Sequence, residues 1–122
     1  MAMVLFDTNA VLRYILQDNL EMAEVVEQQM ANFYCCVPVE VIAEVVYVLS
    51  KVYKVERKII SQIITDITNT DRIRIIDTNV VQHTLGVFAS SSLDFVDCLL
   101  VGYAKEKQYS VFTFDKKLQK YL

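Results

Sequence analysis

The chain has 122 residues, a formal net charge of −3 and a hydrophobic content of 54%. This length fits one domain with one core, so we expect a single domain over residues 1–122. No apolar run reaches the roughly 18 residues that a membrane helix needs. The N-terminus also lacks the basic flank and cleavage site of a signal peptide. These features favour a cytoplasmic globular domain with no membrane partner.

The cysteines and the net charge further restrict the class of protein to which the chain can belong. Cys35, Cys36 and Cys98 form an odd set without a C-x-x-C motif, which argues against a disulfide framework and against a zinc site. We therefore expect three buried, reduced thiols. An acidic chain is unusual for a nucleic-acid binder. Carboxylates gathered in one metal site would account for part of the excess negative charge, because bound divalent ions would offset it.

Short apolar runs alternate with helical patterns along the chain. In chain order we expect a strand over 3–6, helices over 8–17 and 20–31, a strand over 33–37, helices over 38–53 and 55–68, a strand over 72–76, helices over 78–89 and 93–107, a strand over 110–114 and a helix over 116–122. This alternation predicts a parallel sheet covered by helices on both faces. Ligands of such sheets bind beyond the carboxyl ends of the strands.

Several acidic residues lie at or near the carboxyl ends of the predicted strands, which meet at one edge of a parallel sheet. Asp7 and Asp77 directly follow predicted strands, and Asp115 follows the fourth. Glu44 and Asp97 lie in early turns of helices, from which their side chains could reach the same edge. Glu44 sits among core-type residues, and a buried carboxylate is costly unless it is paired or binds a metal.

Each acid also has a purely structural interpretation. Asp7 and Asp115 could simply cap the helices that follow them. The triplet that begins with Asp7 recurs as Asp77-Thr78-Asn79, and we interpret Asp77 as a cap. Glu44 could be an exposed residue on a polar stripe with Glu40 and Lys51.

The region before the sixth helix holds two more acids. Asp94 could form an S-x-x-D capping arrangement with Ser91. Asp97 lies deeper in the helix, where capping explains it less well, so it is the better candidate ligand. His83 is interpreted as structural. The only plausible phosphate-contacting clusters are two groups of basic residues, Lys51, Lys54, Arg57 and Lys58, and Lys116, Lys117 and Lys120.

Four segments in this order resemble the PIN domain, specifically the VapC-type toxins of bacterial toxin–antitoxin pairs. They are FDTNAVLRYIL, VIAEVVYVL, LDFVDCLLVGYA and VFTFDKKL, and together they cover almost the whole chain. The resemblance implies an α/β fold, a three-layer α/β/α sandwich with a parallel sheet of four to five strands. It implies that Asp7, Glu44, Asp97 and Asp115 are the catalytic and metal-binding acidic quartet. Residues implied beside the quartet are Thr8, Asn9, Thr113 and the less constant Asp94.

The activity implied by the resemblance is that of a metal-dependent endoribonuclease, leaving a 5′-phosphate and a 3′-hydroxyl. Carboxylate oxygens suit hard divalent ions, so the expected cofactor is Mg²⁺ or Mn²⁺. The expected partners are an RNA substrate, a cognate antitoxin protein and a second copy in a homodimer. The dimer surface is expected on apolar positions of the first two helices, Val11, Leu12, Ile15, Leu16, Val25 and Val26.

Two other functions remain open. A phospho-receiver domain would also place acids at strand ends, with Asp77 and Lys116 in its key positions, but it leaves Glu44 and Asp97 unexplained. A catalytically silent PIN-fold binding module is the other alternative, although a scaffold has no need for four mutually repelling acids. Cleavage of mixed RNA, with and without EDTA, separates these functions.

Overall fold

A computed structural model describes residues 3–122 of the chain. Its elements are β1 (Met3–Leu5), α1 (Thr8–Leu16), α2 (Leu20–Asn32), β2 (Tyr34–Val37), α3 (Val39–Lys51), α4 (Arg57–Thr68), β3 (Arg74–Ile75), α5 (Thr78–Ser90), α6 (Phe95–Lys107) and α7 (Lys116–Gln119). Each predicted helix is present, and so are the first three strands. Pro38 lies just before α3 as its N-cap.

The three strands form a parallel sheet in the order β1-β2-β3. Val4 lies opposite Cys35, and Val37 lies opposite Ile75. The ladder between β1 and β2 continues past β1, where the Phe6 amide donates to the Cys36 carbonyl at 2.9 Å. The prediction of a mixed α/β domain with a parallel sheet is confirmed.

The two faces of the sheet differ in how they are covered. Phe6, Cys35, Val37 and Ile75 are buried in the core. By strand alternation, Met3 and Leu5 lie on the opposite face, where they are 60% and 63% exposed. Tyr34 and Ile76 are also exposed on that face. These four positions leave apolar surface of the sheet in contact with solvent.

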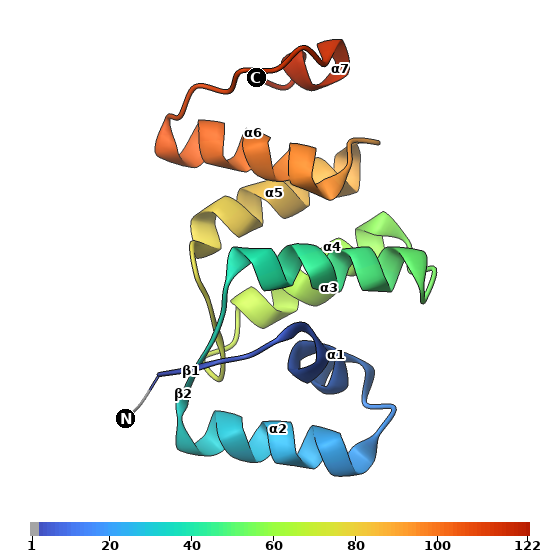
Figure 1. Cartoon of the computed structure of the whole chain (residues 1–122), viewed down its shortest axis with the longest axis vertical. Coiled ribbons are helices and arrows are strands. Elements are labelled where there is room, and N and C mark those ends of the chain that lie inside the picture. Colours follow the sequence, from blue (N-terminus) through green and yellow to red (C-terminus); the bar gives the residue numbers. More distant parts are fainter. Residues whose placement is uncertain (1–2) are drawn as a thin grey trace.

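The sheet has three strands within residues 3–122, and not four to five. Residues 110–114 belong to no strand. Figure 1 shows the reason: after α6 the chain runs along the end of the molecule that is opposite to β1. The segment is held there by Leu118 of α7, which is buried, and by the Lys105 ammonium, which donates to the Leu122 carbonyl at 3.5 Å.

The helices stack along the long axis of the molecule. Figure 1 shows α2 and α1 with the sheet at one end, α3 and α4 in the middle, and α5, α6 and the C-terminal segment at the other end. Apolar residues at helical spacing hold the middle of the stack together. The fully buried side chains include Ile42, Val45 and Leu49 of α3 and Ile60 and Ile64 of α4.

Two further expectations concern the thiols and the membrane. Cys35, Cys36 and Cys98 are buried and free, as predicted. No helix within residues 3–122 has both the length and the apolar character to cross a bilayer.

Candidate active site

Asp7 joins the end of β1 to the start of α1. Its Oδ1 accepts a hydrogen bond from the Ala10 amide at 2.8 Å, so the capping interpretation is confirmed for this residue. Asp7 and the exposed Asn9 line a hollow of about 300 Å³ between α1 and α2. Arg13 also lines this hollow, where it pairs with Asp18 at 2.7 Å. One carboxylate oxygen of Asp7 is thus used by the helix, and the side chain is exposed.

Two other acids lie near Asp97 at the start of α6. Asp97 lies in the first turn of this helix, and Asp94 is its N-cap residue. Partial burial raises the pKa of the Asp97 carboxyl, and the nearby charges of Asp115 and Asp94 raise this pKa further, whereas Lys117 lowers it. These effects place Asp94 and Asp115 within electrostatic reach of Asp97. Two members of the predicted quartet, Asp97 and Asp115, are therefore neighbours in the folded chain.

The Asp94 side chain does not form the predicted capping arrangement. Its carboxylate makes no hydrogen bond to the first turn of α6. The Ser91 hydroxyl instead accepts from the Leu93 amide at 3.3 Å and lies 3.9 Å from the Cys98 thiol. Asp94 is exposed. Its carboxylate is therefore free of the helix end that the sequence pattern assigned to it.

Asp115 is tied to α7. Its Oδ1 accepts from the amides of Lys117 and Leu118 at 2.9 and 3.1 Å, so it is a true cap. The Thr113 hydroxyl accepts from the Asp115 amide at 3.0 Å, so Thr113 lies beside this acid, as the resemblance implied. The basic residues next to it, Lys116, Lys117 and Lys120, lie on the surface.

Glu44 lies on an exposed face of α3. It shares this face with three other exposed residues at helical spacing, Glu40, Tyr47 and Lys51. The argument that a buried carboxylate needs a partner therefore does not apply to Glu44 in this conformation. Its assignment to the quartet rests on the PIN resemblance alone.

The acids of one chain do not form a metal-binding group. Within the part of the chain that the structure describes, no three His, Cys, Asp or Glu side chains approach closely enough to hold an ion. Carboxylate oxygens have the right chemistry for a hard divalent ion. Their placement does not fit one, because Asp7 caps α1 whereas Asp97 lies in α6 and Asp115 caps α7, and Figure 1 shows α3 and α4 between α1 and these last two helices.

Arg57 positions the segment that carries Asp94 and Asp97. Its guanidinium donates from Nε to the Phe88 carbonyl at 2.9 Å and from a terminal nitrogen to the Leu93 carbonyl. It also lies 3.9 Å from the centre of the Phe88 ring. The expectation that Arg57 belongs to a phosphate-contacting surface cluster is therefore wrong. No pattern in the sequence indicates this role, because the carbonyl partners of Arg57 lie about thirty residues away along the chain.

We expect Arg57→Met to lower the free energy of unfolding by about 2 kcal/mol, since two part-buried carbonyls lose the guanidinium donor while the alkyl packing is kept. The Tm of this variant against the wild type measures the loss. Lys58→Met is the matched control, because Lys58 is the exposed neighbour on the same helix. Equal effects of the two substitutions would show that Arg57 does not hold the segment.

The remaining predicted residues are structural, but not all in the expected way. Asp77 occupies the N-cap of α5 with a left-handed backbone (φ 56°), and its side chain makes no capping bond. It lies instead 3.3 Å from the Lys107 ammonium. The capping interpretation of Asp77 is wrong because this backbone turns the side chain away from the helix amides. His83 lies on the surface 3.7 Å from Glu106, consistent with a structural role.

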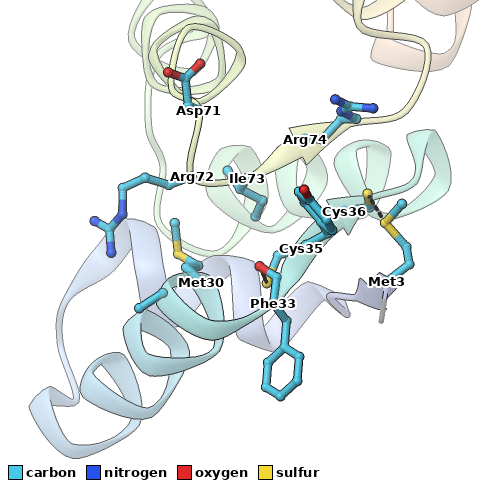
Figure 2. A pocket seen from close by; sticks show the side chains of 11 residues that line it. Met3, Met30, Phe33, Cys35, Cys36, Asp71, Arg72, Ile73 and Arg74 are labelled. Atoms are coloured by element: carbon cyan, nitrogen blue, oxygen red, sulfur yellow. Dashed lines mark hydrogen bonds between the residues drawn. The ribbon is translucent and has the colours of Figure 1, made fainter. Parts of the chain in front are cut away.

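A pocket of about 450 Å³ lies beside the start of β2 and the start of β3. Figure 2 shows Met3, Cys36 and Arg74 around it. The Cys36 thiol lies 2.9 Å from the Met3 sulfur. Of the predicted catalytic acids, none lines this pocket. It is therefore separate from the candidate active site.

Comparison with known proteins identifies the family. The model of the PIN domain family matches residues 4–121, and the chain therefore belongs to the PIN domain family. No curated protein and no solved structure gives a significant match. PIN domains are in general nucleases that use divalent metal ions. The phospho-receiver alternative is thereby set aside.

Proposed function

We propose that this PIN domain is a metal-dependent endoribonuclease, and that it is the toxin of a toxin–antitoxin pair. The observation that carries the proposal is the nearness of Asp94 and Asp115 to Asp97 at the start of α6, where burial and then these like charges raise the pKa of the Asp97 carboxyl. Keeping acids together against their repulsion costs stability, and nucleases of this family use acidic residues for their chemistry. By the PIN resemblance, Asp7 and Glu44 would complete the quartet.

The surface beside these acids suits an RNA backbone. Lys116, Lys117 and Lys120 follow Asp115 directly and are exposed. Lys117 also reaches the Ser92 hydroxyl and lowers the pKa of Asp97, so its charge lies close to the acids. Phosphate contacts by lysines position a nucleic acid without reading its sequence. We infer that these lysines hold the strand while the carboxylates act on its phosphodiester.

The carboxylate set favours Mg²⁺ or Mn²⁺ as the ion. As an antitoxin we propose a disordered segment that folds on binding and presents a basic side chain to the acids. Inhibition by such a partner should weaken as the metal concentration rises, because the basic group and the ion compete for the same oxygens.

Incubation of the purified chain with mixed RNA tests the function. We expect fragments with 5′-phosphate ends in the presence of Mg²⁺ or Mn²⁺, and no cleavage once EDTA removes the ion. Restoration by an excess of Mn²⁺ is the control for damage by the chelator. Binding of RNA without cleavage under any metal condition would favour the catalytically silent PIN-fold module instead.

A further inference from the structure

The start of α6, which carries Asp97 in its first turn, has no cap from its own side chains. Asp94 is the N-cap residue, and its carboxylate makes no hydrogen bond to the first turn. The connection that leads into the helix, residues 91–94, belongs to no helix or strand. Without a side-chain cap, no local contact fixes the point at which the helix begins. The position of Asp97 therefore depends on contacts from elsewhere in the fold.

The Arg57 guanidinium provides such a contact from the first residue of α4. It donates to the Phe88 carbonyl, in the last turn of α5, and to the carbonyl of Leu93, the residue directly before the N-cap of α6. The guanidinium is planar, and its N–H groups point in fixed directions, so it holds both carbonyls in one arrangement. A single side chain thus bridges the two ends of the connection between α5 and α6.

Two aromatic rings form a second connection from Arg57 to α6. The guanidinium lies over the Phe88 ring, and the Phe88 ring contacts the Phe95 ring edge to face with 5.4 Å between their centres. Phe95 is the first residue of α6, two residues before Asp97. Both rings are buried in the close-packed core, so a shift of one ring displaces the other.

The first turn of α6 is anchored to the same backbone carbonyl that Arg57 holds. The Cys98 thiol is fully buried and donates to the Leu93 carbonyl at 3.7 Å. The Cys98 amide donates to the Asp94 carbonyl at 3.0 Å and closes the first helical turn around Asp97. Asp97 directly precedes Cys98 in the chain, so the two residues move together. A displacement of the Leu93 carbonyl is therefore passed on to Asp97.

We propose that Arg57 is a positioning residue for the nuclease reaction, because it fixes the start of α6 and with it the place of the Asp97 carboxylate. The inference rests on the proposed function, in which Asp97 acts on the RNA. Arg57 directs its donors to the protein backbone, so it acts through the connection between α5 and α6 and not by contact with the substrate. A displacement of about 1 Å in a catalytic group can cost about 100-fold in rate, so a contact of this kind has a large effect.

Kinetics of RNA cleavage by variants of the full chain test the proposal. At a temperature well below the Tm of every variant, Arg57→Met should lower kcat by about 10–100-fold and leave KM within about 2-fold of the wild type, because the phosphate contacts are kept. Arg57→Lys should recover only part of kcat, since an ammonium lacks the planar fork that reaches both carbonyls.

Ile64→Val is the matched control for lost stability. Ile64 is fully buried on the same helix, about two turns from Arg57, and its variant loses one buried methyl group. It should keep the wild-type kcat. Wild-type kcat in Arg57→Met, or an equal loss of kcat in Ile64→Val, would overturn the proposal.

Amide hydrogen exchange, followed by NMR, tests the positioning without any measurement of activity. The Cys98 amide reports on the first turn of α6, because it donates to the Asp94 carbonyl. Arg57→Met should speed the exchange of this amide by at least ~10-fold, and Ile64→Val should leave it near the wild-type rate. Unchanged exchange in Arg57→Met, or equal acceleration in both variants, would overturn the proposal. If the wild type cleaves no RNA, the proposed function fails, while the exchange rates still decide whether Arg57 fixes the start of α6.

Discussion

Replacing Asp97 with asparagine is expected to reduce the rate of RNA cleavage by at least ~100-fold while the chain stays folded. Loss of even a supporting group around a metal commonly costs about 10–100-fold, and Asp97 is placed to act directly. Asparagine keeps the shape of the side chain, so the packing at the start of α6 is preserved. Initial rates of cleavage and circular dichroism of the same preparations measure the two effects.

The same variant should change the pH dependence of stability in a defined direction. Burial and the charges of Asp115 and Asp94 raise the pKa of Asp97 in the folded chain. A raised carboxyl pKa means that the ionised group disfavours folding at neutral pH. Asp97→Asn should therefore melt slightly higher than the wild type at pH 7 in metal-free buffer. This advantage should fade as the pH falls through the raised pKa and both forms become uncharged.

Asp71→Asn is the matched control for Asp97→Asn. Asp71 is an exposed aspartate on the loop before β3 and contributes to no part of the candidate site. Its variant should keep the wild-type rate and the wild-type pH dependence of Tm. Full cleavage activity in Asp97→Asn would refute the assignment of this residue.

The second large effect concerns the contact between α5 and α6. An added Cβ at Gly102 would lie 2.3 Å from the Thr84 hydroxyl and 2.9 Å from the Val80 carbonyl. The hydroxyl cannot easily move, because Thr84 is fully buried and donates to that same carbonyl at 2.7 Å. Gly102→Ala should therefore lower the free energy of unfolding by about 3 kcal/mol, at the upper end of the usual cost of overpacking.

Gly86→Ala provides the control for Gly102→Ala on the neighbouring helix. A Cβ at Gly86 meets no atom within 4 Å, so the gain in helix propensity is not offset by a clash. We expect this variant to be more stable than the wild type by about 0.5–1 kcal/mol. Chemical denaturation measures the free energy of unfolding of both variants and of the wild type. Similar stabilities of the two variants would contradict the close packing of α5 on α6.

The sequence predicted the helices and the first three strands well because their signals are local. The isoleucine spacing of α4 and the apolar run of β1 each point to one structure whatever surrounds them. The prediction of a fourth strand over residues 110–114 was wrong within one chain, because strand formation does not depend on a local signal alone. The SVFTF segment has strand propensity, but a strand also needs a partner edge, and the buried Leu118 holds the segment away from β1.

The candidate site was predictable in its chemistry but not in its geometry. Spacing placed Asp97 in the first turn of a helix and Asp115 after an apolar run, and the fold makes them neighbours. The sequence could not tell that Glu44 is exposed, because apolar residues flank an exposed stripe on α3 as readily as a buried one. Nor could it place Arg57, whose backbone partners carry no signature in the sequence.

Binding of Mn²⁺ to the purified full chain, followed by electron paramagnetic resonance, tests most directly whether these acids form the metal site of a nuclease. The wild type and Asp71→Asn should bind the ion with the same affinity, and Asp97→Asn should lose at least ~10-fold in affinity. Wild-type affinity in Asp97→Asn, or no binding to the wild type at millimolar Mn²⁺, would contradict the account.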